Sequence, residues 1–422
     1  NSFESKEREH AEFYISMDAL EEAKKITINI TDEEERELLD IKIKESYKFN
    51  KNRVDMIASG IHYSKRSIEN GRHSFTQYYV PVDFDLYDEK WGHFYIDADI
   101  LHLYDEFKGN DESNTLTYGL GSTYNKTKSS TNTTFLGNIG FKSKYIDLEI
   151  GSTPLGTDIV PKIMGSISLH TGYEKFNLNL KLVRKRDDDS MLSSVGESLE
   201  AKGRDIKWGR IFRSGLEFDL SYSSIFSYSL SLASYPSIEG HHVKQNEELK
   251  AVAIMSYSPN SESFTYIDYS FIAVYDEYNF NSDFFTYGHG GYFSPQEFML
   301  GSFVVDIANI INDEASWKLK ASVGYEQFKV DEVTQYPVSD ANSAGLYGSV
   351  DGYRESGFTY NLTLGSSYRL TKQLDVIGAL SYEKMHTFKD ISIGFSFIYS
   401  FDKKRKVNLY NFHDGHRVKQ LF

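Results

Sequence analysis

From about residue 53 to residue 401, the chain is a succession of segments in which apolar and polar residues strictly alternate. In the clearest segment, 391–401 (ISIGFSFIYSF), every second residue from Ile391 to Phe401 is apolar, and the residues between are mostly serine or glycine. A period of two is typical of β-strands with one apolar face. Segments 176–182 and 317–325 repeat the design. The chain is therefore predicted to be all-β over these residues.

The length of these segments separates two all-β architectures. Strands in a soluble sandwich usually have about five or six residues. The segments here run to about ten or more, which is the length that crosses a bilayer in a tilted barrel strand. Aromatic residues such as Tyr222, Phe226 and Tyr399 gather at segment ends, as an interfacial girdle requires. We therefore predict a transmembrane antiparallel β-barrel, with a soluble β-protein as the alternative.

The number of strands follows from the number of segments. About 17 candidate segments are present, whereas a single-chain bacterial barrel normally has an even number of strands. The weakest are two short segments around 132–152, which we interpret as one bent strand. We expect about 16 strands, a size at which a barrel leaves an aqueous lumen.

The two ends of the chain differ from the predicted barrel domain, 51–401. Residues 1–50 are rich in Glu, Lys, Ala and Leu with some helical spacing, so short helices that join an upstream partner or domain are predicted. Residues 402–422 form a basic tail that opens with Asp402 and then Lys403, Lys404, Arg405 and Lys406. Such a run is most often simply solvated. The alternative is that it folds into the lumen of the barrel.

Composition excludes several classes of function. The formal net charge is -15, from 61 acidic and 46 basic residues, and no basic stripe precedes residue 403, so a nucleic-acid partner is not expected. The chain has no cysteine, which excludes disulfides, thiolate metal sites and thiol nucleophiles. The twelve histidines show no ligand spacing apart from the adjacent pair His241 and His242, so neither a metal site nor a cofactor is predicted.

If the apolar parity of the strands faces lipid, the other parity faces the lumen. The predicted lumenal acids are Asp83, Asp85, Asp97, Asp99, Asp147, Glu149, Glu217 and Asp219. Lys181, Lys318 and Lys320 are the basic counterweight to these acids, and the lumen is predominantly acidic. An acidic lumen repels polyanions and admits neutral or cationic solutes. The alternative is that these acids only solvate the wall.

Long connections are expected at 185–207, 236–247, 277–295 and 328–355, and short ones at places such as 87–90. Barrels of this type carry long loops on one side and tight turns on the other. One long connection contains FFTYGHGGYFSPQ (284–296), with three glycines, five aromatic residues and no aliphatic side chain.

This mixture of residues suits two different arrangements. The rings of Tyr287, Tyr292 and Phe293 can stack on the C–H face of a glucose-type pyranose, while His289 and Gln296 can hydrogen-bond to its hydroxyls. The glycines permit tight or positive-φ backbone. The alternative is an ordinary folded-in loop, stiffened by Pro295, whose aromatic residues pack on each other.

Several stretches resemble the C-terminal domain of cellulose synthase operon protein C, the outer-membrane exporter of bacterial cellulose secretion systems. They are TYGHGGYFSPQ (286–296), RKRDDDSMLSSVGE (184–197), the pair Trp208 and Gly209, GHHVKQN (240–246) and STPLG (152–156). The resemblance implies a 16-stranded, monomeric barrel in the bacterial outer membrane that carries an extended glucan to the cell surface. It also implies an inner-membrane synthase complex and a periplasmic tetratricopeptide-repeat scaffold. Residues 1–50 resemble the end of such a scaffold.

The same resemblance adds Arg184, Asp189, Ser190, Trp208 and Asn246 to the predicted channel and gating residues. Arg186 and Asp187 stand where the family usually has proline and valine, so the identity of the polymer stays open. Cellulose is neutral, whereas a partly deacetylated poly-N-acetylglucosamine is cationic and suits an acidic lumen as well or better.

We therefore predict a secretion pore that is not an enzyme, conducts its polymer passively and is closed at its outer mouth by long loops. One alternative is an outer-membrane hydrolase that uses Ser190 or Ser294 with His289 and Asp189, although no G-x-S-x-G pattern surrounds either serine. Another alternative is a general porin, which would not depend on a synthase operon.

Overall fold

The computed structural model describes residues 55–401 apart from short stretches, together with scattered positions between 11 and 39. The stretches left out are 69–72, 89–91, 108–116, 120–121, 124–127, 144, 174, 202–203, 225, 260, 262, 313 and 339–347. The predicted helical segment 1–50, apart from those scattered positions, and the predicted tail 402–422 lie outside the described residues. Where the structure is described, no helix is long and apolar enough to cross a membrane.

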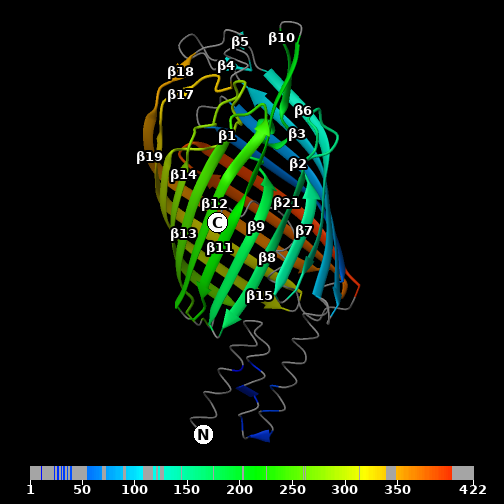
Figure 1. Ribbon diagram of the computed structural model, residues 1–422. Helices are drawn as coiled ribbons and strands as arrows, with labels where there is room; N and C mark the ends of the chain where they lie inside the picture. Colours follow the sequence, from blue (N-terminus) through cyan, green and yellow to red (C-terminus); the bar gives the residue numbers. More distant parts are fainter. Residues whose placement is uncertain are drawn as a thin grey trace.

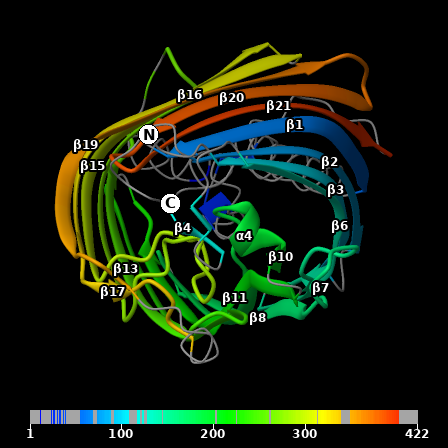
Figure 2. The ribbon, with the colours of Figure 1, turned by 90° about the horizontal axis from the view of Figure 1, so that it is seen from above.

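Sixteen antiparallel strands close into a barrel, as predicted (Figures 1 and 2). Each strand pairs with its neighbours along the chain, and the last strand pairs with the first from Met56 opposite Ser400 to Ile68 opposite Phe388. The strands are β1 (Met56–Ile68), β2 (His73–Asp88), β3 (Gly92–Phe107), β6 (Lys128–Lys142), β7 (Ile146–Ser152), β8 (Ile163–Tyr173), β9 (Phe176–Arg186), β11 (Arg204–Tyr222), β12 (Phe226–His241), β13 (Asn246–Tyr257), β14 (Tyr266–Tyr278), β15 (Glu297–Asn312), β16 (Ala315–Val330), β19 (Tyr353–Arg369), β20 (Leu374–Lys384) and β21 (Phe388–Ser400).

The prediction of one bent strand around 132–152 is wrong. β6 and β7 are separate strands, paired from Asn138 opposite Gly151 to Lys142 opposite Asp147. The Ser143 hydroxyl shapes the turn between them, because it donates to the Ile146 carbonyl at 2.8 Å and accepts from the Ile146 N–H at 3.1 Å. The additional strand is β10 (Glu197–Ala201), which pairs only with the start of β11 and projects beyond the closed ring (Figure 1).

The remaining elements lie in the connections. They are the two-residue strands β4 (Thr117–Tyr118), β5 (Ser122–Thr123), β17 (Val333–Thr334) and β18 (Ser349–Val350), and one helical turn, α4 (Met191–Ser194).

The outer face of the barrel is apolar. In β19, Phe358 is 71% exposed and Leu362 is 45% exposed, whereas Asn361 and Thr363 on the opposite parity are partly buried. A folded chain leaves such rows of large apolar residues uncovered where lipid, not water, is its solvent. Aromatic rings meet at the strand ends, as between Phe226 and Tyr257, whose stacked centroids lie 4.8 Å apart. The alternation therefore reports a lipid-facing wall.

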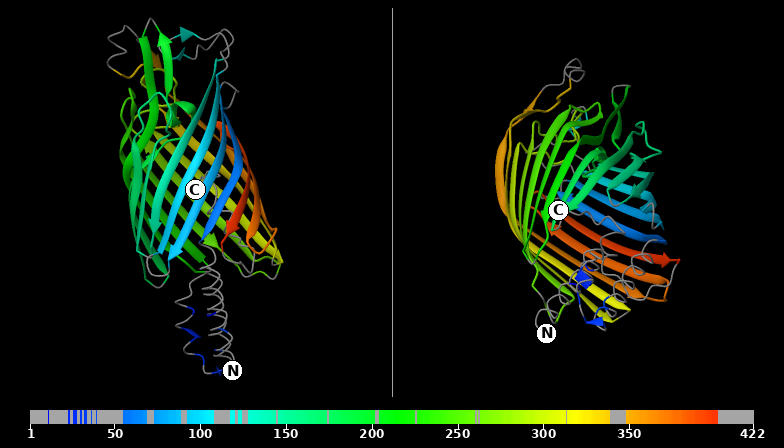
Figure 3. Two further views of the ribbon diagram at one scale, coloured as in Figure 1. Left: turned by 90° about the vertical axis from the view of Figure 1, so that its right-hand side faces the viewer. Right: turned by 60° about the horizontal axis from the view of Figure 1, so that its bottom comes forward.

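Long and short connections segregate to opposite ends of the tilted strands (Figure 3). One end has tight turns such as 370–373, and the other carries the long connections 187–203, 279–296 and 331–352. The prediction of a long loop at 236–247 is wrong, because β12 and β13 run through most of it and only 242–245 connects them.

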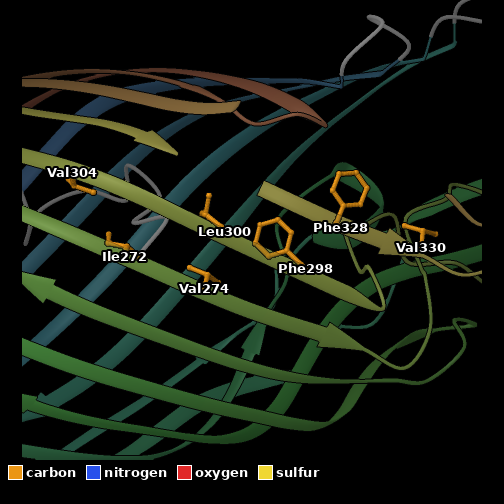
Figure 4. Packing of buried hydrophobic residues seen from close by; sticks show 7 residues of the cluster. All are labelled: Ile272, Val274, Phe298, Leu300, Val304, Phe328 and Val330. Atoms are coloured by element: carbon orange, nitrogen blue, oxygen red, sulfur yellow. The ribbon is translucent and has the colours of Figure 1, made fainter. Parts of the chain in front are cut away.

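The lumenal face is not uniformly polar. Seven buried apolar side chains from β14, β15 and β16 pack together on it (Figure 4). They are Ile272, Val274, Phe298, Leu300, Val304, Phe328 and Val330. Phe293 from the loop 279–296 packs against this cluster, so apolar contact fixes the loop to the wall.

Candidate functional site: the loop-filled mouth and the lumen

Residues 187–196 turn inward after β9 and form α4. Ser190 begins the turn with an extended backbone, and its hydroxyl accepts a hydrogen bond from the Ser193 N–H at 3.1 Å. The Ser193 hydroxyl accepts in turn from the Ser190 N–H at 3.0 Å, which completes a capping box. Gly196, at a φ of 81°, follows the end of the turn. The predicted site residue Ser190 thus has a structural role as a helix cap.

α4 joins the wall to the other loops. Met191 and Val195 pack against Phe75 of β2 and Leu103 of β3. Leu192, on another face of the turn, lies in a second buried cluster with Trp208, Phe285, Tyr287 and Tyr336. In the view along the barrel axis, α4 lies inside the ring of strands (Figure 2).

The glycine-rich loop 279–296 folds back on itself. The N–H groups of Gly291 and Gly290 donate to the carbonyl and hydroxyl of Ser282 at 2.9 and 2.7 Å, and the Ser282 N–H donates to the Ser294 hydroxyl at 2.6 Å. Gly291 has a φ of 68°, and a Cβ there would lie 2.9 Å from Ser190 Oγ. Glycine therefore permits both the backbone conformation and the close approach to α4.

Most of the predicted sugar-binding side chains are buried within this assembly. Tyr287 is 7% exposed, Tyr292 is 1% exposed and His289 is fully buried. The Tyr292 hydroxyl accepts a hydrogen bond from Asn246 Nδ2 at 3.0 Å, and the Tyr287 ring meets Trp208 edge-on with centroids 6.3 Å apart. This is the folded-in loop that the sequence left open as the alternative to a sugar-stacking platform.

Phe293 and Gln296 fix the far end of the same loop. The half-buried Phe293 ring meets Phe298 and Phe328 edge-on, at centroid distances of 5.9 and 5.3 Å. Gln296 Oε1 accepts a hydrogen bond from the Asp331 N–H at 2.8 Å. Both residues therefore hold the loop against neighbouring strands and the loop 331–352.

Arg184 is not brought together with the other predicted site residues. It shares its parity with Leu182, which is 57% exposed on the outer face, and its guanidinium lies 4.3 Å from the Phe212 ring centroid. Its neighbour Val183 takes the buried position. The sequence match placed Arg184 in the motif, but the two-residue period of β9 turns its side chain away from the lumen.

Two arginines that the sequence analysis did not single out anchor the acidic end of the 187–196 segment. Arg66 of β1 forms ion pairs with Asp189 at 2.7 Å and with Asp390 of β21 at 3.3 Å. Arg213 of β11 forms ion pairs with both Asp187 and Glu248. β1 and β11 lie on opposite sides of the barrel (Figure 2), so the segment is tied across the lumen. In the sequence, these two arginines could have been recognised because each lies on the lumenal parity near the end of a strand.

Burial shifts the pKa values of two loop side chains in opposite directions. Burial raises the pKa of Asp283 to about 7, with a further rise from Asp189 that Arg66 opposes. Burial lowers the pKa of His289 to about 4. Both side chains therefore favour their neutral forms inside the closed mouth.

The predicted lumenal acids lie on the face opposite the exposed apolar parity, and Asp85, Asp147 and Glu149 meet histidine or tyrosine. His93 Nε2 lies 2.6 Å from Asp85, and His170 Nε2 lies 3.1 Å from Asp147. The Tyr95 hydroxyl donates to Glu149 at 2.7 Å. Asp83 and Asp97 lie opposite each other in the β2–β3 register, and Asp99 is buried.

The acids on β11 have basic or amide partners. Glu217 lies 2.7 Å from Lys185 Nζ and 3.8 Å from Lys181 Nζ. Asn179 donates to Asp219 at 3.0 Å. Lys318, the next predicted counter-charge, forms an ion pair with Asp306 at 3.0 Å. The lumen is therefore divided into a carboxylate and histidine side and a side of locally paired charges.

The residues of the hydrolase alternative are engaged separately. The Ser190 hydroxyl caps α4, and the Ser294 hydroxyl donates to the Tyr292 carbonyl at 3.1 Å. His289 Nε2 lies 3.0 Å from the Thr334 carbonyl oxygen, and Asp189 pairs with Arg66. Ser190, Ser294, His289 and Asp189 are thus not aligned as a relay. Within the described ranges, no three metal-ligating side chains are grouped to hold a metal ion.

The lipid-facing wall, the closed ring of strands and the long loops gathered at one end define an outer-membrane β-barrel. The chain belongs to the family described as cellulose synthase operon protein C C-terminus, whose profile matches residues 74–402.

Relatives named cellulose synthase operon protein C match part of this chain. That of Xanthomonas axonopodis pv. citri is 24% identical over 277 residues, which cover 60% of this chain and 18% of the relative. That of Pseudomonas fluorescens is 25% identical over 246 residues, covering 57% of this chain and 19% of the relative. The matched region thus spans about a fifth of the length of these curated relatives.

Solved barrel structures show only a distant likeness. Pseudomonas putida OprB at low pH has a TM-score of 0.36 and 9% identity, with 84% of this chain and 95% of that chain covered. An anion-selective porin from Comamonas acidovorans has a TM-score of 0.35 and 10% identity, with coverage of 82% and 98%.

Proposed function

We propose that this barrel conducts an exopolysaccharide of the cellulose type, a neutral β-1,4-glucan, from the periplasm to the cell surface. The observation that carries the proposal is a lumenal wall of small hydroxyl side chains. Ser256 and Ser270 hydrogen-bond across strands at 2.8 Å, and Thr363 and Ser381 do so at 3.0 Å. A neutral polymer can exchange hydrogen bonds along such a wall without a tight site that would stop its transit. Membership in the cellulose synthase operon protein C family supports the same polymer.

Conduction is passive in this proposal, and the long loops act as the gate. The packing of α4 and the loop 279–296 inside the ring supports a gate, because a polymer chain needs the space that these segments fill. The ion pairs of Arg66 and Arg213 are the contacts that opening must break. Opening must also separate the apolar contacts of Met191, Leu192 and Val195 with the wall and the other loops.

The partners follow from the names of the relatives. A cellulose synthase operon implies an inner-membrane synthase that extends the polymer and pushes it outward. We extend this arrangement to the present chain, with a tetratricopeptide-type periplasmic scaffold upstream of residue 51 and a monomeric barrel as the exit.

A second polymer class is favoured by the carboxylate and histidine side of the lumen. Asp83, Asp97 and Asp99 lie on neighbouring strands, and Asp85 and Asp147 each have a histidine as a close partner. A wall of this composition attracts cations. A partly deacetylated poly-N-acetylglucosamine would therefore meet favourable contacts here.

Single-channel conductance in a planar bilayer distinguishes the two polymers. Cello-oligosaccharides and glucosamine oligomers are titrated from the side of the short turns, with an Arg66→Met variant used to widen the mouth. Block by the neutral glucan alone supports the cellulose type, and preferential block by the cationic oligomer supports the second class. The pore proposal fails if no channel is seen even after the loop 279–296 has been shortened.

A further inference from the structure

Arg210 is a buried cation without a carboxylate partner. Its side chain is 1% exposed, and one guanidinium nitrogen, Nη1, donates to the Ile159 carbonyl. Nε and Nη2 have no hydrogen-bond partner within the described part of the chain. Burying charged N–H groups unpaired costs several kcal/mol. A hydrogen-bond acceptor that binds to these two nitrogens would therefore stabilise the buried guanidinium.

The two unpaired nitrogens have the geometry of an anion-binding fork. Nε–H and Nη2–H point along the same edge of the planar guanidinium, and this edge binds carboxylate or phosphate through two parallel hydrogen bonds. The third nitrogen, Nη1, is already fixed by Ile159 and holds the plane in place. This edge is unpaired and enclosed by the protein, so an oxyanion that enters beneath the loop 153–162 would meet two parallel donors.

The backbone is held in an unusual conformation to place this side chain. The β11–β12 register shifts between Gly209 and Phe212, and Arg210 within that bulge has a φ of 51°, in the left-handed region. The adjacent Ile211 is fully buried in an apolar cluster with Tyr292, on the side of the mouth. A left-handed conformation is strained for a residue with a side chain. The bulge directs Arg210 away from that cluster and under the loop 153–162.

The groups around Arg210 reinforce its positive charge. Lys162, Lys207 and Arg210 all act electrostatically on the exposed imidazole of His241, whose ring meets His242 edge-on at 4.5 Å. Lys207 Nζ also forms an ion pair with Asp205 Oδ2 at 3.3 Å. His241 lies opposite Gly209, the residue before Arg210, and the basic groups that act on its imidazole favour an anion.

This cluster borders the lipid-facing surface at the end that carries the long loops. Lys162 directly precedes Ile163, which is 70% exposed and begins the apolar face of β8. Val160, in the same loop, is 74% exposed. The basic groups therefore lie where the apolar face of the barrel ends, at the level of the headgroups of the outer leaflet.

We propose that Arg210, with Lys162, Lys207 and His241, forms a binding site for a phosphate group, supplied by the headgroup of a phosphorylated lipid of the outer leaflet. Free phosphate offers the same chemistry, and the test separates the two sources. The site does not depend on which polymer the barrel conducts, nor on whether it conducts one.

Native mass spectrometry of the full chain in detergent tests the proposal. The protein is incubated with equal amounts of phosphatidic acid and phosphatidylcholine of matched acyl chains, and the retained lipids are counted. Wild type is expected to retain phosphatidic acid preferentially. Arg210→Met weakens that preference about tenfold or more, because each charge-assisted hydrogen bond contributes at least that factor. Arg354→Met, which removes an exposed arginine of the same end of the barrel, leaves the preference unchanged.

Thermal unfolding at constant ionic strength, with inorganic phosphate replacing chloride, identifies the free ion. A higher unfolding midpoint in wild type but not in Arg210→Met, without a lipid preference, supports the site and assigns it to free phosphate. Absence of both effects, or an equal loss in Arg354→Met, overturns the proposal. If Arg210→Met does not fold, Lys162→Met removes an exposed charge of the same cluster, and the same outcomes apply to it.

Discussion

The ion pair between Arg66 and Asp189 is expected to hold the mouth closed. Arg66 also pairs with Asp390 on the neighbouring wall strand, and we expect this second pair to persist when the loops move out. The Asp189 pair therefore distinguishes the two states. A hydrogen bond to a charged group contributes about 1.5–3 kcal/mol, and the side chains of Arg66 and Asp189 are only 13% and 32% exposed. The Arg66→Met substitution should raise the open-state population about 10- to 100-fold.

Single-channel recordings of the reconstituted full chain measure this population directly as open probability. Asp189→Asn, which leaves the Arg66 and Asp390 pair in place, should open the channel to a similar extent. The double variant should add little to either single change, because the two residues share one interaction. Arg354→Met removes an exposed arginine 3.7 Å from Glu297 and serves as the matched control. An unchanged open probability in both Arg66→Met and Asp189→Asn would refute the reasoning.

The loops should respond to pH and to small changes in packing in four further ways. Asp283 has a folded pKa of about 7 against an ordinary 3.8, so its contribution to the closed mouth is lost as pH rises from about 4 to about 7. His289 has a folded pKa of about 4 against an ordinary 6.5, so its contribution is lost as pH falls through that window. The two effects oppose each other, so the open probability of the wild type should change little between about pH 4 and 6.5. His289→Gln should open as pH rises, and Asp283→Asn should open as pH falls. Matching pH profiles in all three proteins would contradict this. Gly291→Ala places a Cβ 2.9 Å from Ser190 Oγ at a φ of 68°. The substitution should destabilise the packed loop 279–296 by about 1–3 kcal/mol and increase its proteolytic cleavage. Cleavage at the wild-type rate would show that the contact is easily relieved. Ser190→Ala removes the cap of α4, which contributes about 0.5–2 kcal/mol to its stability. The substitution should raise conductance without changing ester hydrolysis. An esterase activity that is lost on this substitution would instead support the hydrolase alternative.

The sequence anticipated the barrel because alternation with a period of two is local information. The alternation from Ile391 to Phe401 predicts one lipid-facing row of side chains without information from any other strand. The same reasoning was wrong at 132–152, where the turn at Ser143 is short, and at 236–247, where polar residues continue two paired strands beyond the lipid. It also missed the apolar cluster on the lumenal face, because runs such as FIAVY in β14 are apolar on both parities.

The candidate site was only partly predictable. The glycines and aromatic residues of 284–296 correctly marked a loop with special backbone requirements, but both a sugar platform and a packed loop satisfied that composition. The structure has the packed loop, with His289 and Tyr292 buried. Arg184 was carried into the site by its place in a motif, whereas strand parity points it outward.

What the sequence determined by itself is the all-β class, the lipid-facing parity and the end of the barrel that carries the long loops. These properties depend on neighbours two residues apart or on the spacing of turns. Only the tertiary structure decided what fills the mouth and which charges hold it there. The Arg66 and Asp189 pair joins residues 123 positions apart, and the Arg66 and Asp390 pair joins residues 324 positions apart. Such contacts arise only when the last strand meets the first and the ring closes, since closure brings side chains from distant strands to one rim.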